Sequence, residues 1–105
     1  MSFADNLIEL PTVNNLSRIE LVNGDAVMAV IENRPGSAGS VRVYAWLAHR
    51  FGRIDRAAAE EGLRLYAEHS EDARRHPGKH PNIDRLYAIA AGGTPLRVIP
   101  IPAGQ

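Results

Sequence analysis

Two short runs of hydrophobic residues near the N-terminus, at residues 17–22 and 26–32, carry the alternating pattern of β-strands. They flank Asn23-Gly24, and this pair tolerates the positive φ that both central positions of a tight hairpin turn require. The pattern therefore predicts a β-hairpin. The second run is apolar at both alternate sets of positions, as in strands buried on both faces, so we expect it to lie centrally in the sheet.

Apolar residues recur at helical spacing in most of the remaining chain, between residues that typically start or stop helices. The predicted helices, with their capping or terminating residues, are 3–10 (Ser2 with Asp5, Pro11), 41–51 (Ser40, Gly52), 56–69 (Asp55), one turn after Ser70, and 82–91 (Asn82). The segment PLRVIPI predicts a last strand, which Pro95 and Pro100 confine to an edge of the sheet.

This order of elements predicts an α+β fold formed by residues 1–105 as a single domain. We expect a small, mostly antiparallel sheet, made of the N-terminal β-hairpin and the C-terminal strand, with about three to four helices packed on one face. Because a sheet of about three strands is near the lower limit for independent stability, the helices must supply most of the core.

Charge argues against duplex nucleic acid as a partner. Twelve basic and twelve acidic residues cancel, whereas a domain that binds duplexes usually carries a clear basic excess. Residues 1–40 hold two basic and five acidic residues, and residues 41–105 hold ten basic and seven acidic residues. This asymmetry is too small to indicate a partner.

The chain has no cysteine, which excludes disulfides, thiolate metal sites and a cysteine nucleophile. Its start, MSFADNLIEL, has acidic residues where a signal peptide would have basic ones. No apolar stretch approaches the roughly 20 residues that span a membrane. We therefore expect a cytoplasmic protein with no membrane segment.

The segment RRHPGKHPNIDRL, residues 74–86, concentrates cations in front of a predicted helix start. Unpaired amides and the positive end of the helix dipole favour an anion there, and adjacent cations strengthen the preference. The candidate ligands of the anion are Arg74, Arg75, Lys79, His80 and Asn82. The competing interpretation is a structural hinge between two helices, in which these cations need no ligand.

A metal site in the same region is less well supported. His69, His76 and His80 are suitable metal ligands, but Pro77-Gly78 separates the last two, so no helix presents both on one face. We predict neither a metal nor a cofactor.

The glycine-containing segment RPGSAGSVR, residues 34–42, is a second candidate for anion binding, with Arg34 and Ser40 as ligands. It follows a predicted strand and opens a helix, which is the context of phosphate-binding loops. However, it lacks both the P-loop ending and the three-glycine dinucleotide pattern. A flexible strand-to-helix connection is the simpler alternative.

The segments ENRPGSAGSVRVYAWLAHRFG and GLRLYAEHSEDARRHPGKHPNIDRL together resemble a family of small bacterial proteins known only as a domain of unknown function. The resemblance covers nearly the whole chain, and HPGKHPNIDRL is its most distinctive part. It implies a bacterial, cytoplasmic, single-domain protein and supplies no catalytic residue, cofactor or activity.

The sequence leaves two functional hypotheses. No serine elbow or converging pair of carboxylates is present, so the residues do not propose an enzyme. The leading hypothesis is a non-enzymatic protein that acts by association, most simply as a homodimer, because a small sheet leaves edges open and the first strand has only Arg18 and Glu20 to guard it. The alternative is a module or enzyme that binds a small anion or phosphate through residues 34–42 and 74–84.

Overall fold

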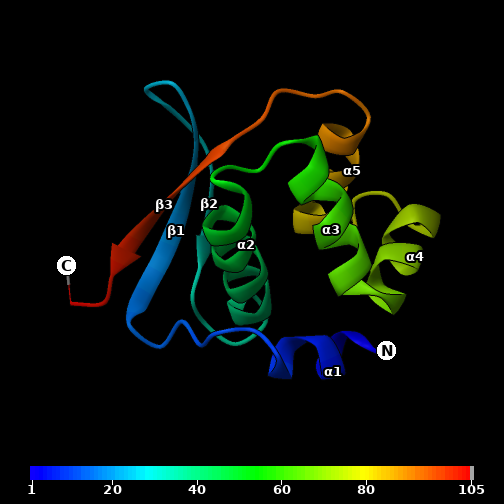
Figure 1. The fold of residues 1–105 in the computed structure, drawn as a ribbon, viewed down its shortest axis with the longest axis horizontal. Coiled ribbons are helices and arrows are strands. Elements are labelled where there is room, and N and C mark those ends of the chain that lie inside the picture. Colours follow the sequence, from blue (N-terminus) through cyan, green and yellow to red (C-terminus); the bar gives the residue numbers. More distant parts are fainter. Residues whose placement is uncertain (105) are drawn as a thin grey trace.

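The computed structural model describes residues 1–104, and over that range the chain forms five helices and one three-stranded sheet (Figure 1). In chain order the elements are α1 (Phe3–Ile8), β1 (Leu16–Asn23), β2 (Ala26–Glu32), α2 (Ala38–Phe51), α3 (Arg56–Tyr66), α4 (Glu68–Arg75), α5 (Pro81–Ala90) and β3 (Arg97–Pro102). The α+β class is confirmed. The single turn predicted after Ser70 is instead a helix, α4, which begins before that residue. Within these residues every helix is too short or too polar to cross a membrane.

The sheet has the order β2-β1-β3, and both pairs of neighbouring strands are antiparallel. The hairpin turn between β1 and β2 uses Gly24 with a φ of 60°, as the Asn-Gly signal predicts. The prediction that the second run of the hairpin lies centrally is wrong. Because β3 pairs with β1, β1 is the central strand and β2 is left at an edge.

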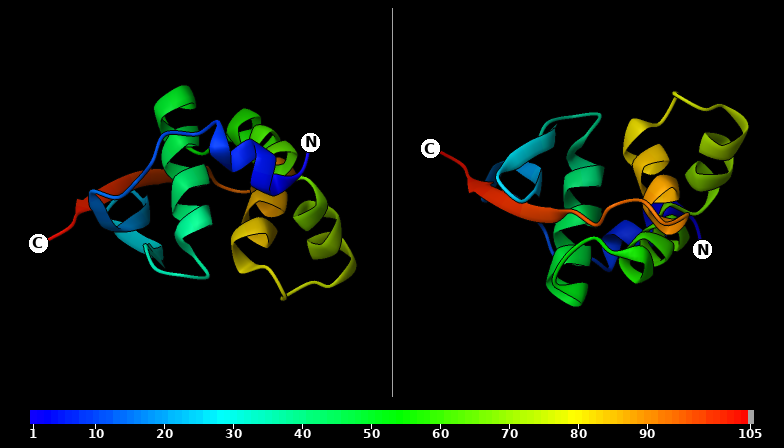
Figure 2. Two further views of the ribbon diagram at one scale, coloured as in Figure 1. Left: turned by 90° about the horizontal axis from the view of Figure 1, so that it is seen from below. Right: turned by 90° about the horizontal axis from the view of Figure 1, so that it is seen from above.

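One face of the sheet is covered by α2, which packs against all three strands. Figure 2 shows α2 between the sheet at one end of the molecule and α4 and α5 at the other. Ile19 and Leu21 of β1 meet Tyr44 and Leu47 of α2 in the core, and all four side chains are inaccessible to solvent. The helices therefore lie in successive layers on a single face of the sheet.

The second layer of helices depends on the close approach that Gly62 allows. α3 packs between α2 and α5, and a Cβ atom at Gly62 would lie 2.7 Å from Cδ1 of Leu86 and 2.8 Å from Cδ1 of Leu47. Such contacts are shorter than van der Waals separation, so a side chain at this position would force the leucines apart.

Local helix signals are confirmed at three positions. Ser2 and Asp5 form a reciprocal capping box at the start of α1. Asp55 Oδ1 accepts a hydrogen bond of 2.9 Å from the amide of Ala58 at the start of α3. Gly52 ends α2 with a φ of 86°.

Three other predicted boundaries are wrong. The helix predicted over residues 56–69 ends at Tyr66, because Ala67 adopts a φ of 51° and a ψ of −116°, and the chain turns into α4. Ser40 and Asn82 do not cap helices, since they lie inside the first turns of α2 and α5. Both side chains instead bond to residues far away or further along the helix, as described below.

Candidate functional site

The segments 34–42 and 74–84, which are distant in the sequence, form two walls of one pocket. Its volume is about 460 Å³. Gly36, Gly39 and Ser40 come from the first segment. The second contributes its residues 79–83, and α1, the end of α3 and α4 complete the lining.

Two helices begin at this pocket, and each leaves an amide unpaired there. Gly39 lies in the first turn of α2 and Asn82 in the first turn of α5. Neither amide N–H finds an acceptor within residues 1–104. Pro81, at the first position of α5, has no N–H to donate. The pocket therefore combines two helix N-termini, where the backbone carries partial positive charge.

Hydrogen bonds of side chains connect the start of α5 to the middle of α2. The Tyr44 hydroxyl donates to the carbonyl oxygen of Asn82. Arg85 Nη1 donates to the Tyr44 hydroxyl at 3.1 Å and to Asn82 Oδ1 at 2.9 Å. Burial raises the pKa of Tyr44 to about 12, although the nearby Arg85 guanidinium acts in the opposite direction. Asn82 thus links α5 to α2 instead of capping its own helix.

Ser40 is similarly engaged in a tertiary contact. The Tyr66 hydroxyl donates to Ser40 Oγ at 2.6 Å, which joins the end of α3 to the start of α2. Burial raises the pKa of Tyr66, so this phenol stays a hydrogen-bond donor at neutral pH.

An aromatic and apolar wall forms part of the pocket lining. Phe3 stacks on Tyr66 with ring centroids 5.1 Å apart, and His69 meets the Phe3 ring edge-on at 5.2 Å. Leu7 and Ile83 complete this wall. The His69 ring also lies 5.9 Å from the ring of His80, so it borders both the apolar wall and the cationic side.

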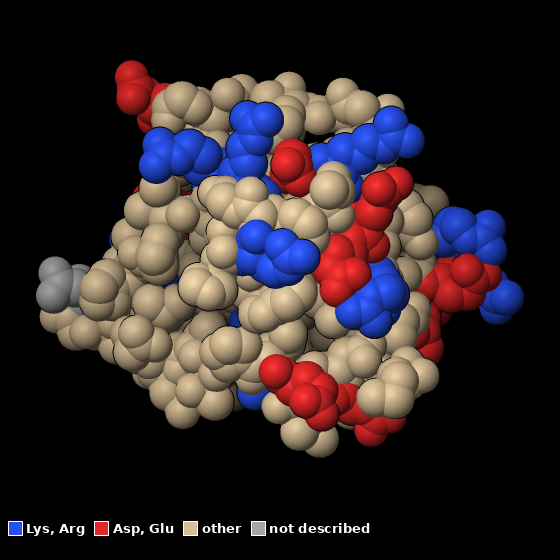
Figure 3. All heavy atoms as spheres, viewed as in Figure 1, with Lys and Arg blue, Asp and Glu red and all other residues tan. Residues whose placement is uncertain are grey.

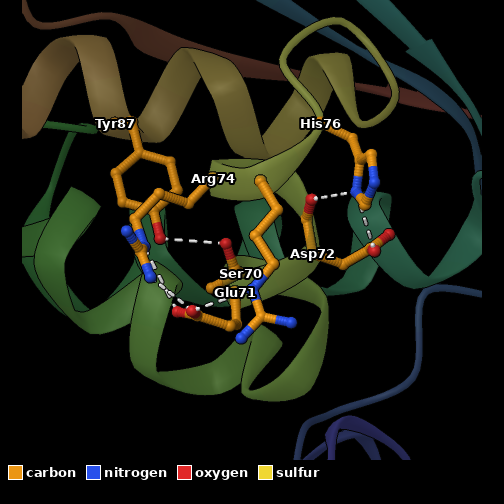
Figure 4. Close-up of polar contacts among 7 residues, drawn as sticks. Ser70, Glu71, Asp72, Arg74, His76 and Tyr87 are labelled. Carbon is orange, nitrogen blue, oxygen red and sulfur yellow. Dashed lines mark hydrogen bonds and ion pairs between the residues drawn. The ribbon is translucent and has the colours of Figure 1, made fainter.

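The Asp72 carboxylate contacts three basic side chains of the α4–α5 turn. Its Oδ2 lies 2.7 Å from His80 Nε2 and 2.9 Å from Lys79 Nζ, and its Oδ1 lies 3.2 Å from His76 Nδ1. Figure 4 shows the contact with His76. The hydrogen bonds from His80 and Lys79 hold the pKa of the Asp72 carboxyl well below its usual range.

A second carboxylate fixes the tip of the same turn. The amide of Gly78 donates to Asp84 Oδ2 at 2.9 Å. His76 and His80, each followed by proline, leave the helical region with ψ angles of 71° and 78°. Asp72 and Asp84 therefore both hold the turn in place. This agrees with the interpretation of residues 74–86 as a structural connection between two helices.

The structure brings four of the seven predicted anion ligands to the pocket. Lys79, His80, Asn82 and Ser40 line it, and these four stay a predicted ligand-binding set. Sequence reasoning did not assign Phe3 or Tyr66 to a site, because each looks like an ordinary member of an apolar helix stripe.

The other three predicted ligands lie elsewhere. Arg74 pairs with Glu71 on the exposed side of α4 (Figure 4). Arg75 pairs with the same carboxylate. The side chain of Arg34 is 68% exposed and lies 4.0 Å from Glu32. Helical spacing explains why Arg74 and Arg75 pair with Glu71, because residues three and four positions apart share one face of a helix.

The histidines approach one another without forming a metal site. His76 and His80 both contact Asp72, although Pro77-Gly78 separates them. Within residues 1–104 no group of three or more histidine, aspartate or glutamate side chains is arranged to hold a metal ion.

Basic and acidic side chains are interspersed over the helices on the face shown in Figure 3. Lys and Arg do not form a continuous basic surface on this face. This view contains no wide positive patch of the kind that follows a phosphate backbone.

Residues 3–100 match the family described as an uncharacterized protein conserved in bacteria (DUF2322), and the chain belongs to this family. No curated protein and no solved structure matches the chain. The description of this family assigns no activity.

Proposed function

We propose that this member of the family binds a small anionic compound, a phosphate or carboxylate attached to an apolar or aromatic group, in the pocket between α2 and α5. The observation that carries the proposal is the convergence of residues 34–42 and 74–84 on one pocket. Each segment is a candidate for anion binding by itself, and the two are distant in the sequence.

The polar side suits an anion. The free amides of Gly39 and Asn82 are donors at helix N-termini, where negative charge is stabilised. Lys79 adds a side-chain donor beside them. His80 also lines the pocket, where its Nε2 is engaged by Asp72. Asp72 occupies one donor of Lys79, and an ammonium group has three, so Lys79 can bind a ligand while it keeps its contact with Asp72.

The apolar part of the pocket requires that the ligand also carry an apolar or aromatic group. Phe3, Leu7, Tyr66 and Ile83 offer a surface that bare inorganic phosphate would leave in contact with water. The volume of about 460 Å³ falls within the roughly 300–1,000 Å³ typical of ligand pockets. An aryl phosphate or a nucleoside monophosphate would use both sides, and we expect such ligands to bind more tightly than orthophosphate.

A thermal-shift titration tests the proposal. The panel contains orthophosphate, an aryl phosphate, a nucleoside monophosphate, a sugar phosphate and a dicarboxylate, and calorimetry follows any ligand that raises the melting temperature. A ligand at a hundredfold excess over Kd stabilises the folded state by about 2.7 kcal/mol. Unchanged melting temperatures across the panel would contradict the proposal.

Two substitutions localise the binding. Lys79→Gln removes a cation that lines the pocket, and we expect the affinity for the anion to fall about tenfold or more, as for loss of a charge-assisted hydrogen bond. Arg75→Gln is the matched control, because it removes a cation of the same segment that lies outside the pocket. Equal losses in both variants would indicate non-specific charge attraction.

Association with another protein is a second candidate function, and one observation favours it. Val27, Met28 and Val30 of β2 are exposed to 54%, 59% and 46%, which is unusual for three large apolar side chains within four residues. Light scattering from low micromolar to near-millimolar concentration tests self-association. A monomer mass throughout would exclude it.

A further inference from the structure

We infer that two copies of this chain associate through β2, which pairs with β2 of the second copy in antiparallel orientation to form a continuous six-stranded sheet. The inference rests on the association candidate above and names its surface and partner. In β2 the amino-acid composition does not match the position of the strand in the sheet. This strand has the composition of a strand buried on both faces, yet it lies at an edge with its outer side chains in water.

The outer face of β2 lies opposite the helices. The register pairs Ala29 with Leu21, which is buried, and pairs Val30 with Glu20 on the face away from α2. Val27 pairs with Val22 across an irregularity that leaves Met28 without a partner in β1. Val27, Met28 and Val30 therefore form one exposed apolar row along the edge, hereafter the β2 row.

The two edges of the sheet differ in their protection. Pro100 and Pro102 lie in β3, where they remove amide donors from that edge. β2 contains neither proline nor lysine, and its only charged residue is Glu32 at the end of the strand. The irregularity at Met28 is the one feature of β2 that normally discourages edge pairing. The β2 edge is thus much the less protected of the two.

The position of Glu32 selects a second copy in antiparallel orientation. Its carbonyl oxygen already accepts from Ser37 Oγ, so the free edge is the remainder of the strand, Ala26 to Ile31. In an antiparallel pair centred on that stretch, the two Glu32 carboxylates lie at opposite ends, about 20 Å apart at roughly 3.3 Å per residue. A parallel pair would place them side by side. With a net charge of zero, the two chains also lack long-range repulsion.

The size of the contact predicts a weak dimer. A paired stretch of six or seven residues is only about 20 Å long, and its area falls below the roughly 800 Å² per partner of a standard stable interface. We therefore expect the weight-average mass to rise gradually from the monomer toward the dimer as concentration increases, without a plateau at low micromolar concentration.

The test introduces one positive charge into the β2 row. Val30→Lys places an ammonium group on the outer face beside the apolar side chains of the second copy's β2. Because lysine on an edge strand opposes pairing, we expect the mass to remain that of a monomer at every concentration. Ile8→Lys is the matched control, because Ile8 of α1 is another exposed large apolar residue, at 75% exposure, and the charge change is identical. Circular dichroism checks that both variants are folded, and Met28→Lys replaces Val30→Lys if the latter is not.

Single cysteines provide a second readout, since the chain has none of its own. Met28→Cys, Ala29→Cys and Val30→Cys, taken one at a time, should give a disulfide-linked dimer on mild oxidation in at least one case, because residues at the centre of an antiparallel pair lie next to their own copies, within disulfide range. Ile8→Cys should give much less.

The outcomes separate the two levels of the proposal. A wild-type chain that is monomeric at all concentrations overturns both self-association and the β2 interface. A dimer that persists in Val30→Lys, or that links best through Ile8→Cys, leaves self-association intact and overturns the β2 interface. Loss of the dimer in Val30→Lys alone, with cross-linking confined to β2, supports the inference.

Discussion

Apolar side chains lie on both faces of the sheet, but in opposite environments. On the inner face, Ile19 and Leu21 are completely buried beneath α2. On the outer face, Met28 and Val30 are about half exposed or more. Hydrophobicity alone does not distinguish these positions. The comparison shows that an apolar strand face is covered only where another element packs on it, and in this chain all the helices pack on one side.

The strongest test of this difference is Leu21→Ala on the inner face. Leu21 lies on the central strand with no solvent exposure, so truncation removes buried methyl groups and leaves a cavity. We expect the free energy of unfolding to fall by about 2–5 kcal/mol. Denaturant titration at low protein concentration measures it. A loss below 1 kcal/mol would mean that the inner face is not a packed core.

Tyr44→Phe should have the next largest effect, through a polar contact on the same buried side. The hydroxyl bonds both the Asn82 carbonyl and Arg85, and its loss removes both contacts, while Arg85 keeps its bond to Asn82 Oδ1. We expect a cost of about 1–3 kcal/mol at neutral pH. Tyr87→Phe is a suitable comparison, because its hydroxyl donates to Ser70 O from a half-buried position.

The pH dependence of Tyr44→Phe provides an independent check. The pKa of Tyr44 is raised to about 12 in the folded chain, above its value of about 10 in the unfolded chain. The stability that this shift contributes is fully present below about pH 10 and is lost as the pH rises toward 12. The difference in unfolding free energy between wild type and variant should therefore shrink over that range.

Asp72→Asn probes the exposed polar network around the α4–α5 turn, and we expect a smaller effect because solvent screens it. The pKa of Asp72 is depressed in the folded state by His80 and Lys79. Its contribution is present above the unfolded pKa of about 3.9 and is lost as the pH falls below that value. The difference in melting temperature between wild type and variant should therefore diminish in acid. A difference that is constant with pH would contradict this role, and Asp25→Asn in the hairpin turn is the control.

The smallest effect on monomer stability is expected for Val30→Thr on the outer face. The side chain is already 46% exposed, so the free energy of unfolding at low concentration should change by less than about 0.5 kcal/mol. A larger loss in concentrated than in dilute solution would sharpen the comparison, because in the six-stranded sheet Val30 would lie beside side chains of the second copy's β2.

The sequence by itself determined the features that depend on neighbouring residues. The Asn-Gly turn, the capping box of Ser2 and Asp5, and the helix stop at Gly52 each involve atoms within a few residues, and all three are confirmed. The α+β class follows from the order of such elements. Pro100 was likewise expected at a sheet edge, because proline has no backbone N–H to donate to a neighbouring strand.

Only the tertiary structure decided which strand is central and what the polar residues at helix starts do. β3 pairs with β1 across more than seventy residues of chain, so the alternation within the hairpin carried no information about it. Ser40 and Asn82 are residue types that commonly cap helices. Ser40 Oγ instead accepts from Tyr66, and Asn82 accepts from Arg85 through its side chain and from Tyr44 through its carbonyl. The pocket exists for the same reason: contacts between distant segments are formed by packing, and local propensity does not encode them.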